Sequence, residues 1–341
     1  MNKILWISVL ILLFLITSLR FFDSKPALPP VNTNIIESKQ AAARYAFDDL
    51  TIPFLRNRTY SSNIGPMVEY KNYSAYNSFL TSYYSDGLKI NGLLTIPKGN
   101  APEQGWPAVV FVHGYIPPTL YKTTEKYIEY IDYLAKNGVV VFKIDLRGHG
   151  NSEGEPSGAY YSSDYVIDTL NAYEGIKNMA GVNPNNISIW GHSMAGNVAF
   201  RSAVIQKNIP KIFLWAGAVY TYADFAKYGI SDNSYRPPDL SVDRQKRRKL
   251  LFDTYGTFNE NNEFWKKVAG TNYLDEVSSK FIILHAVDDQ VVNIGYSRDL
   301  DTELKKQGKN SVLFEYKSGG HNISGNSFVP AINVVLQEIK K

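Results

Sequence analysis

The sequence GHSMAG at residues 191–196 is the most informative stretch of the chain. It follows a short apolar run, residues 187–190, and precedes residues 194–206, which have the composition of a helix. A serine in a tight turn between a strand and a helix is typical of a nucleophile elbow, which exposes its hydroxyl at the helix N-terminus. Glycine is expected two positions either side of this serine, and position 195 is alanine instead. The alternative is an ordinary strand-to-helix turn that a serine caps.

Short apolar strands alternate with helices on both sides of this turn. Such strands are typical of a mostly parallel sheet with helices on both faces, so the sequence predicts an α/β fold. Strands are expected at residues 88–96, 108–112, 139–144, 187–190, 212–215, 281–284 and 311–316. Helices are expected at residues 123–136, 163–179, 194–206, 294–307 and 328–339. Residues 218–272 break the alternation, and we expect them to form a cap inserted over the carboxyl edge of the sheet.

A catalytic serine needs a base that removes its proton and an acid that orients the base. With an elbow of this kind, the chain order is serine, acid and histidine. His321 is the only histidine that follows both Ser193 and a suitable acid. The acid is expected just after the strand at 281–284, where Asp288 and Asp289 are both candidates.

The oxyanion that forms during acyl transfer needs two backbone amides. One should belong to Met194, directly after the serine. The other should belong to Tyr115, in the loop after the strand at 108–112, where Gly114 permits a close approach. We expect His113 to order this loop through hydrogen bonds.

A second loop, residues 145–152, follows another expected strand. Its glycines lack the spacing of a phosphate-binding loop, and we expect Asp145 and Arg147 to brace it by forming a network with each other. His149 and His192 lie in no pattern of metal ligands, so the sequence predicts neither a metal nor a cofactor.

Together these motifs resemble the α/β-hydrolase superfamily and, more narrowly, the catalytic domain of prolyl oligopeptidase-like serine peptidases and their bacterial relatives. The resemblance covers about residues 60–341 and rests on residues 85–88, 106–114, 145–154, 191–196, 285–292 and 319–322. It implies an α/β-hydrolase fold with Ser193 as the nucleophile, Asp289 as the acid and His321 as the base. Asp289 occupies the acid position of the family's His-Gly-x-x-Asp pattern, in which Ala286 replaces the glycine. Esterases, lipases and peptidases share this machinery, so the resemblance does not define the substrate.

The composition narrows the chemistry further. The 341 residues include no cysteine and carry a net charge of +4. The lack of cysteine excludes a cysteine nucleophile, thiolate zinc sites, disulfides and lipid attachment through cysteine. The small net charge does not indicate a nucleic-acid partner. A basic run at residues 244–249 in the expected cap could steer anionic substrates, touch lipid headgroups or form a solvated helix face.

The N-terminal residues favour a membrane anchor. Residues 4–19 are almost entirely apolar and fall just short of the about 17–25 residues that span a bilayer, and Phe21 and Phe22 could extend the span. No small-residue cleavage site follows, so we expect residues 1–22 to be an uncleaved signal-anchor, with a cleaved signal peptide as the alternative. Residues 23–60 would then be a linker and helical lead-in, and residues 61–341 a hydrolase domain outside the cytoplasm.

The sequence therefore predicts a membrane-anchored, extracytoplasmic serine hydrolase. It would cleave a peptide or ester bond of a small substrate through an acyl-enzyme, with peptides favoured. A carboxylesterase or lipase-like hydrolase is the enzymatic alternative. A catalytically silent binding protein on the same fold is the non-enzymatic alternative.

Overall fold

The computed structural model describes residues 47–231 and 241–341. The expected signal-anchor at residues 1–22 lies outside these ranges. Within them, no helix combines the length and the apolar character needed to cross a bilayer.

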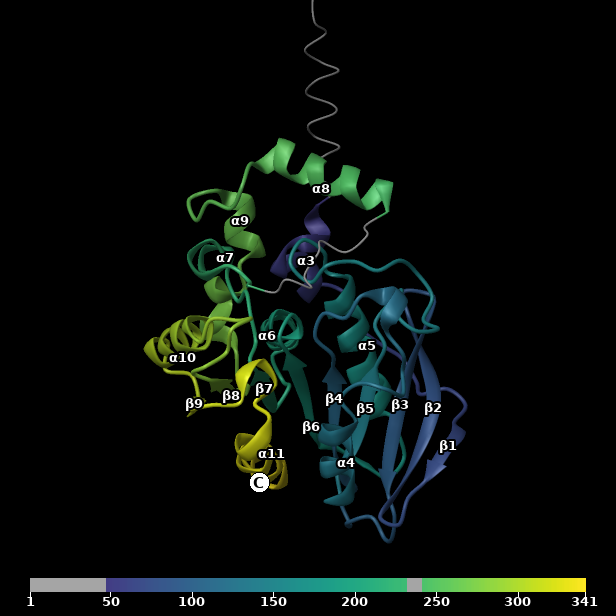
Figure 1. Ribbon diagram of the computed structural model, residues 1–341. Coiled ribbons are helices and arrows are strands. Elements are labelled where there is room, and N and C mark those ends of the chain that lie inside the picture. Colours follow the sequence, from purple (N-terminus) through teal and green to yellow (C-terminus); the bar gives the residue numbers. More distant parts are fainter. Residues whose placement is uncertain (1–46, 232–240) are drawn as a thin grey trace, which may run out of the picture. The chain divides into compact units, whose positions relative to one another are not determined.

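A nine-stranded sheet runs through the described residues (Figure 1). Its strands are β1 (Val68–Asn72), β2 (Tyr76–Ser85), β3 (Leu88–Pro97), β4 (Trp106–Val112), β5 (Val140–Ile144), β6 (Val182–His192), β7 (Lys211–Trp215), β8 (Lys280–Ala286) and β9 (Ser311–Tyr316). Their order across the sheet is β1-β2-β3-β5-β4-β6-β7-β8-β9. The first three strands pair antiparallel, as does β3 with β5, and every pair from β5 to β9 is parallel. This sheet confirms the predicted mostly parallel α/β fold.

Helices cover both faces of the sheet. On one face lie α3 (Ile52–Arg56), α5 (Asp164–Lys177), α6 (Ala195–Ile205) and α10 (Gly295–Lys306), and on the other lie α4 (Ile128–Lys136) and α11 (Phe328–Lys340). Strand β4 shows how one run of sequence serves both layers, since its side chains point alternately to opposite faces. Val110 and Val112 pack in the first core and Val109 and Phe111 in the second, and all four are fully buried.

Short 3-10 helices complete the described elements. They are η1 (Asp48–Leu50), η2 (Pro118–Leu120), η3 (Gly270–Glu276), η4 (Gly320–Asn322) and η5 (Gly325–Ser327).

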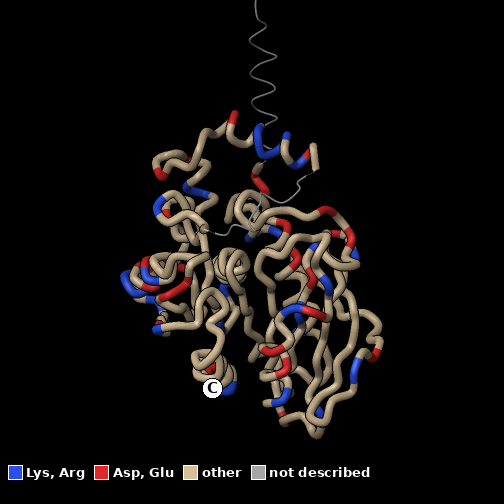
Figure 2. The backbone as a smooth tube through the Cα atoms, in the orientation of Figure 1, with Lys and Arg blue, Asp and Glu red and all other residues tan. Residues whose placement is uncertain are grey.

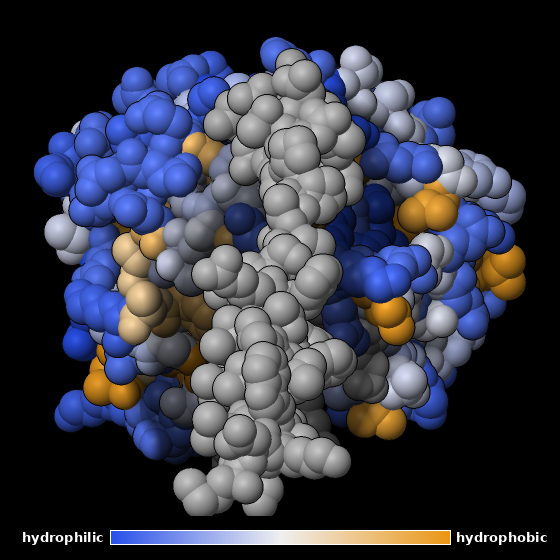
Figure 3. Space-filling model, turned by 90° about the horizontal axis from the view of Figure 1, so that it is seen from above, coloured by the Kyte–Doolittle hydropathy of each residue, from blue (hydrophilic) through white to orange (hydrophobic). Residues whose placement is uncertain are grey.

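The chain between β7 and β8 contains α7 (Tyr222–Tyr228), α8 (Val242–Tyr255), α9 (Glu263–Val268) and η3. A capping box of Thr221 and Asp224 starts α7, and the Ser241 side chain accepts a hydrogen bond from a backbone amide in the first turn of α8. Lysines and arginines gather on α8 (Figure 2). The visible surface on this side is largely hydrophilic (Figure 3).

Helix α4 begins later than the sequence predicts. The sequence predicts a helix from residue 123, but α4 starts at Ile128, after Tyr127 in a left-handed conformation. The residues before α4 are bound by other loops. Thr123 Oγ1 donates a hydrogen bond to Asp145 Oδ2, just after β5. The Tyr127 hydroxyl accepts a hydrogen bond from the Gly114 amide. These tertiary contacts outweigh the helical preference of this stretch.

The predicted network between Asp145 and Arg147 is wrong. Asp145 accepts hydrogen bonds from Thr123 and from the Tyr121 hydroxyl. Arg147 turns the other way and pairs with Asp168 at 2.7 Å and with Asp164 at 3.0 Å. Since Asp168 has no exposed side-chain surface, this pair fastens the loop after β5 to helix α5 from inside the protein.

Arg147→Met should lower the free energy of unfolding by about 3–5 kcal/mol, because it leaves the Asp168 carboxylate buried without its partner. Urea denaturation measures this loss. Arg298→Met is the matched control, since it breaks an ion pair with Glu315 whose side chains are 49% and 35% exposed. We expect this control to lose no more than about 1 kcal/mol. Equal losses in the two variants would contradict a structural role for the Arg147 pair.

Candidate active site

Ser193 lies in the turn between β6 and α6 with a φ of 54°. Residues other than glycine rarely adopt this left-handed backbone conformation, which costs about 1–3 kcal/mol. The neighbouring chain supplies the restraint. The Ser193 amide donates to Trp215 O at 3.0 Å, and the Ala218 amide donates to Ser193 O at 3.2 Å. The end of β7 therefore holds the serine in the geometry of a nucleophile elbow.

Two glycines allow the turn to pack this closely. A Cβ on Gly191 would lie 2.1 Å from the carbonyl oxygen of Ala195, and a Cβ on Gly196 would lie 2.6 Å from the Cα of Gly217. Ala195, the departure from the expected glycine, is fully buried in the core on the α6 side of the sheet. The extra methyl group is therefore accommodated by core packing.

Asp289 and His321 are joined by a hydrogen bond. His321 Nδ1 donates to Asp289 Oδ2 at 2.9 Å, and the Asp289 side chain is fully buried while that of His321 is 18% exposed. Burial alone would raise the pKa of Asp289. Hydrogen bonds from His285, His321 and the Val292 amide outweigh it and hold the pKa well below its usual range. A charged acid therefore faces the histidine predicted as the base.

The neighbouring Asp288 has a different task. Its carboxylate accepts hydrogen bonds from the Gly320 amide at 2.9 Å and from the Gly319 amide at 3.3 Å. These two residues directly precede His321. Asp288 therefore fastens the backbone that carries the imidazole, while Asp289 contacts the imidazole itself.

His285 is a second histidine on the same carboxylate, and its role was not predicted from the sequence. Its Nε2 lies 3.1 Å from Asp289 Oδ2 and 3.0 Å from Val292 O, and its Nδ1 lies 2.7 Å from Ser297 Oγ. The ring is fully buried. Because both partners of Nε2 are acceptors, the proton belongs on Nε2, and Nδ1 accepts from the serine hydroxyl. The signal in the sequence that could have indicated this contact is the position of His285, four residues before Asp289 and near the end of a strand.

The loop after β4 approaches the serine, as the sequence predicted for the second oxyanion donor. A Cβ built on Gly114 would lie 3.1 Å from Ser193 Cβ, which is a tight contact, so glycine favours this close approach. Tyr115 follows in the same loop. Met194 is the first residue after the serine and caps α6, where helix amides lack acceptors within the helix. His113 orders the loop through Nδ1, which lies 2.7 Å from Gly114 O.

A chain of hydrogen bonds links this loop to the loop of His321. The Gly114 amide donates to the Tyr127 hydroxyl, which lies 2.7 Å from His192 Nδ1. His192 Nε2 lies 3.1 Å from His321 O and must donate to it. Burial, reinforced by the nearby His321, lowers the pKa of His192 to about 3. His192 is therefore a neutral bridge that positions both loops around Ser193.

The structure thus brings the predicted residues to one edge of the sheet. Asp289 and His321 are bonded, and Ser193 adjoins both Gly114 and the His192 bridge. Among the described residues, no hydrogen bond joins Ser193 Oγ to His321. Catalytic hydrogen bonds are often long without substrate and tighten in the complex.

Two family models match the chain. Residues 170–340, half of the chain, match the family described as BAAT / Acyl-CoA thioester hydrolase C terminal. Residues 106–231 match the family described as Serine aminopeptidase, S33.

The chain matches part of two longer curated relatives. The sequence is 26% identical over 253 residues to the uncharacterized peptidase YuxL of Bacillus subtilis, covering 70% of this chain and 34% of YuxL. It is 25% identical over 214 residues to Protein ABHD12B of Homo sapiens, covering 59% of this chain and 50% of that protein. The chain thus spans about a third to a half of the length of these relatives.

Solved structures share the fold at low identity. An acetyl xylan esterase from Paenibacillus sp. R4 aligns with a TM-score of 0.60 and 16% identity, covering 93% of this chain and 97% of the esterase. An acylaminoacyl peptidase in complex with Z-Gly-Gly-Phe-chloromethyl ketone aligns with a TM-score of 0.58 and 18% identity, covering 79% of this chain and 42% of the peptidase. These likenesses show that the chain shares the fold of the two enzymes. The chain belongs to the α/β-hydrolase superfamily, in the family of the BAAT / acyl-CoA thioester hydrolase C-terminal domains, and its domain is prolyl oligopeptidase-like.

The two adjacent aspartates provide a sharp test of the site. Asp289→Asn should lower kcat by up to about 10⁴-fold, because an amide cannot stabilise the imidazolium that forms on His321. Asp288→Asn should lower kcat by less than about tenfold, since an asparagine Oδ1 still accepts the Gly320 amide. Steady-state kinetics on a common ester substrate measures both. A larger loss in Asp288→Asn would reverse the assignment of the acid.

Proposed function

We propose that this protein is a hydrolase that forms an acyl-enzyme on Ser193. The observation that carries the proposal is the bond between Asp289 Oδ2 and His321 Nδ1, at the sheet edge where Ser193 is held in a left-handed turn. With Nδ1 occupied by the acid, Nε2 of His321 is the nitrogen available to the serine hydroxyl.

In the proposed mechanism, Ser193 Oγ attacks the substrate carbonyl while His321 Nε2 takes the hydroxyl proton. The amides of Tyr115 and Met194 donate to the oxygen on which negative charge develops. The tetrahedral intermediate collapses as His321 returns the proton to the leaving group. Water then attacks the acyl-enzyme with His321 again as the base, and Ser193 is released. Asp289 stays ionised throughout and stabilises the imidazolium.

A fluorophosphonate probe tests the nucleophile, because it reacts with a serine only where the hydroxyl is activated. The folded protein should be labelled, and Ser193→Ala should not. Ser324→Ala, which changes a serine in the same loop as His321, is the matched control and should still be labelled. Absence of labelling in the folded wild-type protein would favour a catalytically silent binding protein.

We propose a peptide as the substrate, with an ester or thioester as the second candidate. The serine aminopeptidase match and the likeness to YuxL favour the peptide. The match to acyl-CoA thioester hydrolases over half of the chain favours the second candidate. The two differ in the leaving group, since an amine must be protonated by His321 to depart, whereas an alcohol or thiol is a better leaving group.

Aminoacyl p-nitroanilides and short-chain p-nitrophenyl esters compare these candidates directly. Esters are intrinsically more reactive, so both substrate classes should be hydrolysed if the protein is a peptidase. We expect kcat/KM for the best anilide to lie within about 10²-fold of that for the best ester. Turnover of esters alone, with anilides untouched, would make the protein an esterase.

We also propose that residues 1–22 anchor the domain outside the cytoplasm. The support is the apolar sequence of residues 4–19 between basic residues. The full chain should remain in the membrane pellet after alkaline carbonate extraction, and external protease should reach its domain in intact cells or spheroplasts. A variant that lacks residues 1–22 should be recovered in the soluble fraction. A full chain that carbonate releases would contradict the anchor.

A further inference from the structure

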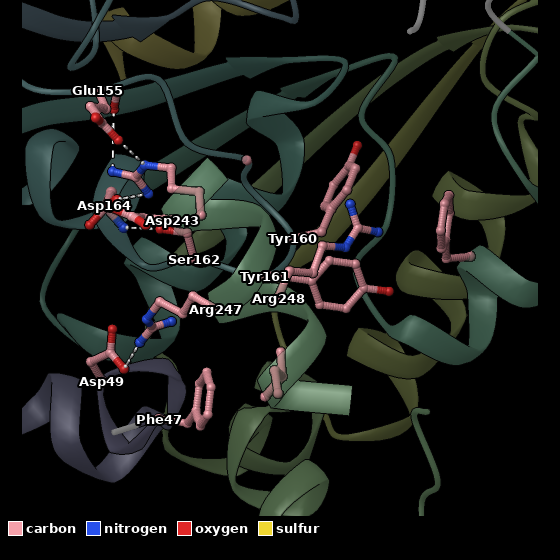
Figure 4. A pocket seen from close by; sticks show the side chains of 14 residues that line it. Phe47, Asp49, Glu155, Tyr160, Tyr161, Ser162, Asp164, Asp243, Arg247 and Arg248 are labelled. Atoms are coloured by element: carbon pink, nitrogen blue, oxygen red, sulfur yellow. Dashed lines mark hydrogen bonds and ion pairs between the residues drawn. The ribbon is translucent and has the colours of Figure 1, made fainter. Parts of the chain in front are cut away.

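A cavity of about 380 Å³ lies between helix α8 and the segment at residues 155–164, and none of its lining residues is used in the proposed mechanism (Figure 4). Its volume lies within the range of about 300–1,000 Å³ that is typical of small-molecule sites. Side chains from η1, from the segment before α5 and from helices α7 and α8 line it.

The wall of this cavity is rich in aromatic surface. Phe47, Tyr160, Tyr161 and Phe225 line it, together with Leu251 from α8. Tyr160 and Leu251 are buried, and the Tyr160 and Phe225 rings pack with centroids 5.9 Å apart. A packed wall of this kind suits an apolar or aromatic ligand body.

Two arginines of α8 at the cavity are already neutralised. Arg244 bonds Asp164 at 2.8 Å and lies 3.5 Å from Glu155, and Arg247 bonds Asp49 at 2.7 Å. These pairs join the helix to the segment at residues 155–164 and to η1. They leave little net charge for a ligand.

Arg248 differs from both. Its guanidinium lies 4.7 Å from the centre of the Tyr161 ring and 5.8 Å from that of Phe252. It forms no ion pair with any residue in the described ranges. Asp243, the other acid at the cavity, turns to solvent, with its side chain 93% exposed. Arg248 therefore presents the one lining guanidinium in this part of the chain that lacks a carboxylate partner.

We propose that this cavity binds an organic acid with an apolar or aromatic body, whose carboxylate pairs with Arg248. The planar guanidinium can bind a carboxylate through two parallel hydrogen bonds, while its face remains stacked on Tyr161. The body of the ligand lies against the aromatic wall. No residue that lines the cavity belongs to the proposed catalytic set, so ligand binding can be tested without hydrolysis.

The sheet order relates this cavity to the catalytic edge. Strands β4 and β6, which lead to Tyr115 and Ser193, lie between β5 and β7. The cavity is walled by the segment that follows β5 and by the insertion that follows β7. Both walls therefore start from the carboxyl edge of the sheet, where α/β folds bind ligands. The acid can be one end of the substrate or a separate ligand.

Isothermal titration calorimetry with 4-phenylbutyrate tests the site on the intact chain. The wild-type protein should bind it, and Arg248→Gln should weaken binding at least about tenfold, because the charge-assisted bond is lost. Arg248→Lys should retain part of the affinity. Lys249→Gln removes the same charge from the next, 75% exposed residue of α8 and should bind like wild type. The neutral 4-phenylbutanol should bind more weakly and not respond to Arg248→Gln.

A second variant tests the cavity without changing its charge. A Cβ added to Gly158, which lines the cavity, meets no atom within 4 Å, so Gly158→Leu should fold and occupy ligand space. It should abolish binding of 4-phenylbutyrate. Equal binding by wild type, Arg248→Gln and Gly158→Leu would overturn the proposal, as would the absence of binding to the folded wild-type chain.

An inhibition experiment shows whether the acid is part of the substrate or a separate ligand. Inhibition of ester hydrolysis by 4-phenylbutyrate, lost in Arg248→Gln, supports the cavity as part of the substrate site. Binding without inhibition supports a separate ligand. If neither labelling nor hydrolysis occurs but 4-phenylbutyrate binds, the proposed function fails and the site remains.

Discussion

The conformation of the turn at Ser193 depends on backbone contact between neighbouring parallel strands. Trp215 at the end of β7 accepts a hydrogen bond from the Ser193 amide, and the Ala218 amide just after β7 donates to the Ser193 carbonyl. Gly196 and Gly217 bring the two backbones almost into contact, and together these contacts hold Ser193 in its left-handed conformation. A side chain at either glycine would separate α6 from the segment after β7. The strain at one residue is thus balanced by contacts distributed over two strands and a helix, which places the serine hydroxyl at the sheet edge.

Around this turn, burial and hydrogen bonding give the histidines different tasks. Burial lowers the pKa of both His113 and His192 to about 3, so each acts as a neutral hydrogen-bonding group that fixes a loop. His285 is also buried, and its Nε2 donates a hydrogen bond to Asp289. His321 alone combines partial exposure with a bond to Asp289. Environment, more than residue type, separates the candidate base from its supports.

The sequence predicted the features that depend on local pattern and chain order. The parallel strands, the elbow at Ser193 and the pairing of His321 with an acid all follow from short motifs. The choice of Asp289 over Asp288 came from family resemblance, because both residues have the same chemistry and differ only in where their carboxylates reach. The structure supplies the physical difference, since one binds a ring nitrogen and the other binds backbone amides.

The features that sequence reasoning missed depend on contacts between distant segments. Arg147 pairs with Asp168, a residue 21 positions away whose burial was not apparent from local pattern. The late start of α4 depends on Thr123 and Tyr127 reaching other loops. The cavity at α8 combines residues from η1 and from the segments that follow β5 and β7, so no single motif describes it.

The adjacency of Asp288 and Asp289 limits how this protein can change over evolution. Asp288 sets the position of the His321 loop, and Asp289 sets the orientation of the His321 ring. Both must therefore lie at a fixed number of residues from the end of β8. A one-residue insertion or deletion between Ala286 and Asp289 would displace both anchors at once. Length variation among descendants of this sequence should therefore concentrate in exposed turns such as residues 256–262 and spare this tetrapeptide.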